Sequence, residues 1–345
     1  MTKNESPPGF TTPRAHKQTT QKNPWQCRGA VTKKKKLKKA RASDTMKITT
    51  AVSGLFIIAH NVLSAHGIRI LQTNDDGWVE LYTRVLNDKL REKDHDVVLS
   101  APAGDRSHGK FYDYPMDGPT NRNASRPDLN WVNGHPVHGV RYGVEFTGPE
   151  HWMGQRPDLV VTGPNRGHSI WPWHFHIPHV VAAAYASSAH AVPAISFSVP
   201  ARRQAMWLWN ETAPPVSASV YAELAATLID HLAESAGDGK PLLPWQTYLN
   251  VNFPVRTEAC EKASDFKWFF AGASPPDFPP RAAEVKWCGN TAWQPEYEVL
   301  GYREECRISV AISDGADMTD RNDRETRSDL VTRLAKLIKC DRDGH

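Results

Sequence analysis

The fold is decided by the stretch Ile68-Arg-Ile-Leu-Gln-Thr-Asn-Asp-Asp-Gly77. Its first six residues predict a short buried strand, and Asn-Asp-Asp-Gly is typical of a turn that ends one. A helix is predicted from Val79 to about Glu92, because the apolar residues there recur at helical spacing. A strand, a tight polar turn and an amphipathic helix together indicate the beginning of an α/β domain.

The same alternation continues toward the C-terminus. Further strands are predicted at 96–102, 157–163, 193–199, 248–253 and 307–312, and helices at 140–146, 180–191, 216–234 and 324–339. Nearly continuous apolar strands between helices indicate a parallel sheet that is covered on both faces. The predicted fold class is therefore three-layer α/β/α, with a doubly wound, mostly parallel sheet, a C-terminal β extension and a terminal helix. Residues 113–130 are rich in Pro, Asn and Asp and predict a surface loop.

Polar clusters follow three of the predicted strands, at Asn74–Gly77, Gly104–Ser107 and Gly163–Gly167. Ligands of open α/β sheets bind outside the carboxyl ends of the strands, so we expect these clusters to meet. Two adjacent carboxylates at a buried strand end are costly unless a cation compensates them. Carboxylate, hydroxyl and amide oxygens suit hard divalent ions. The predicted metal ligands are Asp75, Asp76, Ser107 and Asn165.

Each of these motifs taken alone is more often an ordinary turn or a polar loop. The prediction rests on finding all three at successive strand ends. The chain has no Gly-rich dinucleotide fingerprint after the first strand and no Gly-Lys-Ser/Thr phosphate loop.

Charge is divided unevenly along the 345 residues. The whole chain carries +4, but residues 1–45 hold twelve Lys or Arg and two acids, so the rest of the chain carries −6. An acidic body argues against a partner that is a nucleic-acid polymer. Residues 1–45 lack apolar periodicity and predict a disordered basic extension. The cluster Lys33–Lys39 allows a second interpretation, a nuclear address in a protein that begins at Met1.

Residues 46–67 have the layout of a secretory signal peptide if synthesis begins at Met46. Lys47 gives a basic start, Ala51–Leu63 is largely apolar, and small residues follow at Ser64–Gly67. The apolar run is too short for a stable membrane anchor. This pattern predicts a secreted protein without an anchor after processing, and the alternative is a buried helix of an intracellular protein.

Four of the five cysteines lie near the C-terminus, at Cys260, Cys288, Cys306 and Cys340. In a secreted chain an even set predicts two disulfides, with three connectivities open. Asn123-Ala-Ser125 and Asn210-Glu-Thr212 are sequons for N-glycosylation, which agree with secretion.

Three segments resemble the signature segments of the SurE family. They are Ile68–Gly77, Ser-Ala-Pro-Ala-Gly-Asp-Arg-Ser107 and Pro-Asp-Leu-Val-Val-Thr-Gly-Pro-Asn165. Tyr248-Leu-Asn-Val-Asn-Phe-Pro254 and residues 306–320 resemble its secreted fungal branch. The resemblance covers about residues 68–340, which we expect to form one domain. It implies a Rossmann-like fold, a homodimer and hydrolysis of phosphate monoesters such as nucleotides by a metal-dependent nucleotidase or acid phosphatase.

By this resemblance Asp75 and Asp76 would be catalytic, and Asp75, Asp76, Ser107 and Asn165 would hold one Mg²⁺ or Mn²⁺. The ion would polarise a phosphoryl oxygen and lower the pKa of an attacking water. The substrate-binding residues expected around it are Asn74, Asn165 and His179.

One segment departs from the family pattern. The family places a Ser-Gly-Thr turn before the alanine-rich helix, where hydroxyl and N–H groups cradle phosphate. This chain has Ile177-Pro178-His179 there, so a hydroxyl and an N–H donor are lost. Nearby histidines could donate instead when protonated, or could bind a transition metal. The alternative is a secreted, non-catalytic SurE-like protein. The histidines concerned are His168, His174, His176 and His179.

Overall fold

The computed structural model describes residues 67–108, 120–201, 213–237, 240–275, 278, 285–291 and 293–340. The helices and strands of these residues all belong to one compact unit, Val62–His345. The basic extension 1–45, residues 46–66 of the signal peptide predicted at 46–67, and the sequon at 210–212 lie outside the described residues.

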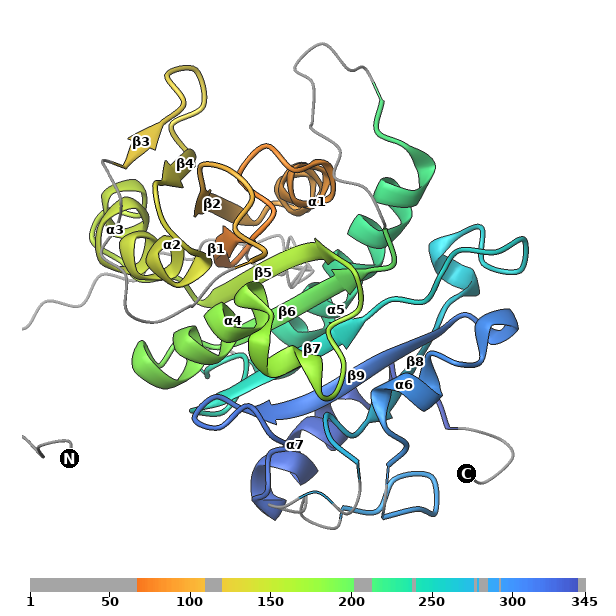
Figure 1. Ribbon diagram of the computed structural model, residues 1–345. Helices are drawn as coiled ribbons and strands as arrows, with labels where there is room; N and C mark the ends of the chain where they lie inside the picture. The colour runs from red at the N-terminus through yellow and green to blue at the C-terminus, as the bar shows by residue number, and fades with distance from the viewer. Residues whose placement is uncertain are drawn as a thin grey trace, which may run out of the picture. The chain divides into compact units, whose positions relative to one another are not determined.

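Within the described residues, nine strands form one mixed sheet in the order β3-β4-β2-β1-β5-β6-β7-β9-β8 (Figure 1). Six central strands, from β4 to β7, are mutually parallel, whereas β3 runs antiparallel to β4 and β9 antiparallel to β7. The α/β class with a mostly parallel sheet is therefore confirmed. The strands are β1 (Arg69–Thr73), β2 (Asp96–Pro102), β3 (Asn121–Arg122), β4 (Leu129–Val132), β5 (Leu159–Arg166), β6 (Ala194–Val199), β7 (Thr247–Asn252), β8 (Lys267–Ala271) and β9 (Arg307–Asp314).

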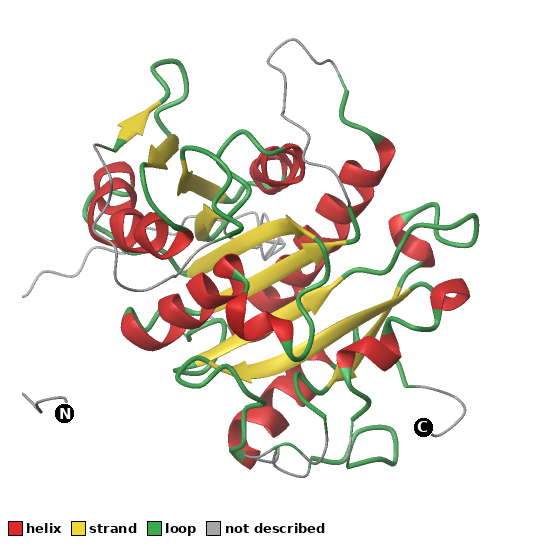
Figure 2. Ribbon diagram, viewed as in Figure 1, coloured by secondary structure: helices red, strands yellow, loops and turns green. Residues whose placement is uncertain are grey.

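Helices cover both faces of the sheet (Figure 2). Helices α1 and α5 pack together with α7 on one face, and α2 and α4 pack together on the other. Each face buries its own apolar cluster, which explains why the central strands are apolar on both sides. The helices are α1 (Leu81–Glu92), α2 (Pro136–Tyr142), α3 (Gly148–His151), α4 (Pro178–Ala189), α5 (Val216–Ala236), α6 (Glu296–Val299) and α7 (Arg324–Leu334).

Several elements differ from the sequence prediction. Strands β3 and β4 lie within or just beyond the stretch predicted as a loop, and β8 was not predicted. These strands are short and are defined by their pairing, β3 with β4, β4 with β2 and β8 with β9, which local sequence does not reveal. The terminal helix α7 ends at Leu334 rather than at residue 339.

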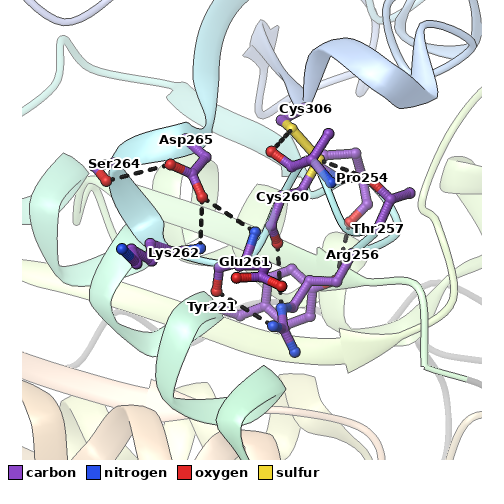
Figure 3. Close-up of a disulfide and its surroundings, with 11 residues drawn as sticks. Tyr221, Pro254, Arg256, Thr257, Cys260, Glu261, Lys262, Ser264, Asp265 and Cys306 are labelled. Atoms are coloured by element: carbon purple, nitrogen blue, oxygen red, sulfur yellow. Dashed lines mark hydrogen bonds between the residues drawn. A yellow bond between two sulfur atoms is a disulfide. The ribbon is translucent and has the colours of Figure 1, made fainter.

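Two disulfides join the four C-terminal cysteines, as Cys260–Cys306 and Cys288–Cys340. The two disulfides were predicted, and the structure selects one of the three connectivities. Cys260 and Cys306 are buried, and the loop beside them is held by Arg256, whose Nε donates to the carbonyl of Cys260 (3.3 Å), as Figure 3 shows. The two disulfides close loops of 46 and 52 residues. In the entropic account each of them raises the free energy of the unfolded chain by about 4 kcal/mol, because it restricts the conformations of that chain.

The strand order reverses at β1. The chain leaves β1 for β2 on one side and later returns to β5 on the other side. The carboxyl ends of β1 and β5 therefore flank the switch point, where ligands bind in doubly wound sheets.

Among the described helices, none is long and apolar enough to cross a membrane.

Candidate metal centre

The turn after β1 is held by the fully buried side chain of Asn74. Its Nδ2 donates to Thr83 Oγ1 (2.6 Å), and its Oδ1 accepts from the backbone N–H of Gly77 (3.1 Å). Gly77 has a φ of 102°, and a Cβ there would approach the backbone of Gly104 to 3.2 Å, so glycine is strongly favoured. The amide of Asn74 thus orders the turn, and its substrate-binding role stays a prediction.

The carboxylate of Asp76 connects the ends of three strands. Arg166, at the end of β5, donates to it through Nε (2.9 Å), through Nη2 and through its backbone N–H (3.2 Å). Ser107, beyond β2, donates to it through Oγ (3.3 Å) and also contacts Asp105 (2.6 Å). Burial and the neighbouring Asp75 raise the pKa of Asp76, and Arg166 opposes them. The three polar clusters are therefore adjacent, as the strand order predicted.

The carboxylate of Asp75 is fully buried, and neither oxygen has a hydrogen-bond partner among the described residues. The imidazole Nδ1 of His179, at the start of α4, lies 3.5 Å from Asp75 Oδ2. Within the same ranges this Nδ1 also lacks a hydrogen-bond partner, whereas Nε2 lies 3.2 Å from the hydroxyls of Ser169 and Ser198. Because an unsatisfied buried carboxylate is costly, this arrangement is suited to a cation.

Asn165 offers a further acceptor. Its side chain is buried, its Nδ2 donates to the carbonyl of Arg166 (3.1 Å), and its Oδ1 has no partner in the described part of the chain. The register of β5 against β6 shifts between Thr162 and Asn165. At Gly163 in this irregularity φ is 100°, and a Cβ would lie 2.3 Å from the carbonyl oxygen of Phe197. Glycine is therefore required to place Asn165 at the strand end.

The predicted ligands thus fall into two groups. Asp75 and Asn165 keep oxygens without hydrogen bonds, which fits a divalent ion. Asp76 accepts from Arg166 and Ser107 donates to Asp105, so these two groups already have hydrogen-bond partners. No group of three His, Cys, Asp or Glu arranged to hold a metal occurs in the residues the structure describes. A metal bound by Asp75 and Asp76 therefore needs neutral ligands beside these carboxylates, such as the oxygens of Asn165 and Ser107.

Glu80 is a buried carboxyl near the site that the sequence analysis missed. Its Oε2 accepts from the backbone N–H of Thr83 (3.0 Å) and caps α1. Burial raises the pKa of Glu80 to about 8, against the Thr83 hydrogen bond, and the charge of Asp76 adds to the increase. Burial and the charge of Asp76 therefore both favour the neutral form of Glu80.

The histidines that precede α4 do not gather around one point. His168 Nε2 lies 2.9 Å from the carbonyl of Phe253, and His174 Nε2 lies 3.1 Å from that of Met318. His176 is exposed. Burial lowers the pKa of His174 to about 4, so it is uncharged above that pH. A transition-metal site formed by the four predicted histidines together is wrong for the described residues, because no such group is present among them.

A buried polar network beneath the loop was also missed. Ser169 N–H donates to Asn252 Oδ1 (2.7 Å), and the carbonyl of Ser169 accepts from Asn250 Nδ2 (2.7 Å). Glu296 in turn accepts from Asn250 Nδ2 (3.0 and 3.1 Å) and Asn252 Nδ2 (3.0 Å). Burial raises the pKa of Glu296 well above its usual range. Two asparagines in an otherwise apolar strand are a signal from which this network could have been predicted. Nothing in the sequence around Glu296 indicates that its carboxyl group is buried.

The sequence profile described as Survival protein SurE matches residues 70–272, which is more than half of the chain. The chain belongs to the SurE family. It is 27% identical over 203 residues to an acid phosphatase of Yarrowia lipolytica, covering 54% of this chain and 56% of that protein. It is 30% identical over 190 residues to the 5′-nucleotidase SurE of Desulfatibacillum aliphaticivorans, covering 54% and 66%. The chain thus spans about half to two thirds of the length of these two relatives.

A solved SurE structure has the same fold. The crystal structure of the SurE protein from Aquifex aeolicus aligns with a TM-score of 0.51 and 19% identity, covering 76% of this chain and 98% of that chain. The profile match contains Asp75, Asp76, Ser107, Asn165 and His179, so the candidate metal centre lies within the SurE region.

Proposed function

We propose that this protein is a metal-dependent phosphomonoester hydrolase of the nucleotidase or acid phosphatase type. The observation that carries the proposal is the buried carboxylate of Asp75, which has no hydrogen bond among the described residues and lies at the switch point of a SurE-family sheet. The names of the relatives, an acid phosphatase and 5′-nucleotidases, support this class of reaction.

In this proposal Asp75 and Asn165 hold Mg²⁺ or Mn²⁺, with Asp76 and Ser107 as further ligands. Bound there, the ion supplies Lewis-acid polarisation of a phosphoryl oxygen and a lower pKa for the attacking water. Asp75 and Asp76 position this centre at the end of β1. Arg166 donates to Asp76 and to Asp105, and its guanidinium is suited to pair with substrate phosphate.

The test is hydrolysis of p-nitrophenyl phosphate and of nucleoside monophosphates between pH 4 and 8, with EDTA, Mg²⁺ or Mn²⁺. We expect hydrolysis that requires the metal and that Asp75→Asn and Asp76→Ala abolish. If the wild-type protein shows no metal-dependent hydrolysis above these variants, the enzyme proposal fails.

A second candidate is a non-catalytic SurE-like protein that keeps the metal site. The observation that favours it is the start of α4, where Ile177 is the N-cap residue without a side-chain cap hydrogen bond and Pro178 follows it. None of the three residues Ile177, Pro178 and His179 carries a hydroxyl to hold phosphate. Calorimetry separates the two candidates, because metal and phosphate binding without turnover supports the second.

We further propose that the protein is secreted and belongs with the fungal acid phosphatases. The two disulfides and the likeness to the acid phosphatase of the yeast Yarrowia lipolytica support this proposal. Mass spectrometry of the natural N-terminus tests it. A start near Ile68 supports signal removal, and a start at Met1 supports the intracellular alternative.

A further inference from the structure

The imidazole of His179 lies beside the carboxylate of Asp75, with Nδ1 3.5 Å from Oδ2. It is fully buried in the first turn of α4, at the position where the family pattern has a hydroxyl. A fully buried imidazole normally uses both of its nitrogens in hydrogen bonds. Here one nitrogen is hydrogen-bonded and the other, Nδ1, faces a carboxylate that also lacks partners.

The distance between these groups is informative. A charged imidazole and a carboxylate that form an ion pair close to about 2.7–2.9 Å. The separation of 3.5 Å between His179 Nδ1 and Asp75 Oδ2 is longer than a hydrogen bond. Two ligands that share one ion at about 2.1 Å each lie roughly 3 to 3.5 Å apart. The geometry is therefore closer to that of two ligands than to that of a salt bridge.

The ring of His179 is held in the orientation that a metal ligand needs. Its Nε2 lies 3.2 Å from the hydroxyls of Ser169 and Ser198, which lie 2.7 Å from each other. Ser169 is fixed in turn by Asn250 and Asn252. Metal-binding histidines usually donate their second N–H to an acceptor oxygen, which fixes the tautomer and leaves the other nitrogen free to coordinate, and a serine hydroxyl can accept such a bond here.

We infer that His179 Nδ1 is a ligand of the divalent ion in this site, beside Asp75 and Asn165, and that the site prefers a transition ion such as Zn²⁺ or Co²⁺ to Mg²⁺. Mg²⁺ prefers all-oxygen ligands, whereas imidazole nitrogen suits the later first-row ions. The inference rests on the proposed function, since it needs an ion at Asp75. The inference assigns His179 a role as a metal ligand, in place of the direct substrate binding predicted from the sequence.

The first experiment detects the nitrogen ligand directly. The full chain is loaded with Mn²⁺ as a spectroscopic probe and examined by pulsed electron paramagnetic resonance, which detects the ¹⁴N nuclei of a coordinated imidazole. We expect a ¹⁴N signal that changes to the ¹⁵N pattern when the histidines are ¹⁵N-labelled. The signal should be lost in His179→Gln and kept in the matched control His176→Gln, since His176 is exposed on the same segment.

The second experiment measures metal preference by calorimetry without substrate. Loss of a nitrogen ligand should weaken Zn²⁺ binding at least about 10-fold in His179→Gln, and should change Mg²⁺ binding less than about 3-fold. Thermal unfolding confirms that the variant is folded, and His179→Asn replaces it if it is not.

The outcomes separate the two proposals. If Mn²⁺ binds, Asp75→Asn abolishes the binding and no histidine nitrogen is detected, the role of His179 is overturned and the proposed function stands. If no divalent ion binds the wild-type chain, the metal site and the inference both fail. A nitrogen signal that persists in His179→Gln also overturns the inference.

Discussion

Asp75 and Glu296 are both carboxyl groups buried within the same sheet domain, yet their surroundings are opposite. Glu296 accepts three hydrogen bonds from the amides of Asn250 and Asn252. Asp75 accepts none in the described part of the chain and faces the unpaired Nδ1 of His179. Burial costs a carboxylate several kcal/mol wherever it is not compensated.

The difference separates a structural polar group from a binding group. The hydrogen bonds of Glu296 are complete without a ligand, so it supports the loop at Ser169. Among the described residues no hydrogen bond compensates the burial of Asp75, and binding sites commonly keep such destabilising groups because these groups hold the ligand. Each prediction below tests this contrast, beginning with the largest expected effect.

The largest effect is expected for Asp75→Asn. Metal-dependent hydrolysis should fall at least about 1000-fold, or roughly 4 kcal/mol in the activation free energy, because the ion loses its charged ligand. The unfolding free energy of the metal-free variant should equal or exceed that of wild type, because a buried unpaired charge is removed. Hydrolysis assays and urea unfolding in EDTA measure the two effects. A lower unfolding free energy of the metal-free variant would contradict the claim that the burial of Asp75 destabilises the metal-free protein.

Glu296→Ala should reduce stability, whereas Asp75→Asn should reduce activity. The unfolding free energy should fall by roughly 3 kcal/mol, because the amides of Asn250 and Asn252 lose their acceptors inside the protein. Glu298→Ala is the matched control, since Glu298 lies on the same short helix and is exposed. Urea unfolding of both variants is the measurement, and equal stability of the two would show that the network contributes little.

Adding metal should stabilise the protein through Asp75. At a free Mn²⁺ concentration of 100 times the dissociation constant, the unfolding free energy should rise by about 2.7 kcal/mol relative to EDTA. The increase should vanish in Asp75→Asn and persist in Glu296→Gln. An equal increase in Asp75→Asn would place the ion elsewhere.

The smallest effect is expected for Glu296→Gln, which keeps the shape of the side chain. At pH 4.5 its unfolding free energy should lie within about 1 kcal/mol of wild type. Burial raises the pKa of Glu296 above 4.5, so the unfolded chain loses this proton first as pH rises. The stability of wild type relative to the variant should therefore decline above pH 4.5. Unfolding curves at several pH values measure this, and a parallel pH dependence of the two proteins would contradict it.

Much of the fold followed from patterns that are local in the sequence. Apolar runs alternating with helical periodicity predicted most of the central strands, α1, α4 and α5. The strands that were missed, β3, β4 and β8, are short or pair near the sheet edges. Their extended conformation depends on a neighbouring strand, so their own residues carry little signal.

The sequence by itself determined the α/β class, the Asp75–Asp76 turn and the presence of two disulfides, because each depends on residue type and short spacing. Tertiary structure decided which polar groups are compensated. It paired Asp76 with Arg166, dispersed His168, His174 and His176, and brought His179 to Asp75. It also placed Glu296 under Ser169 through two asparagines. These contacts join residues that lie between 44 and 144 positions apart in the sequence. Only the packed sheet therefore brings their charges and hydrogen bonds together.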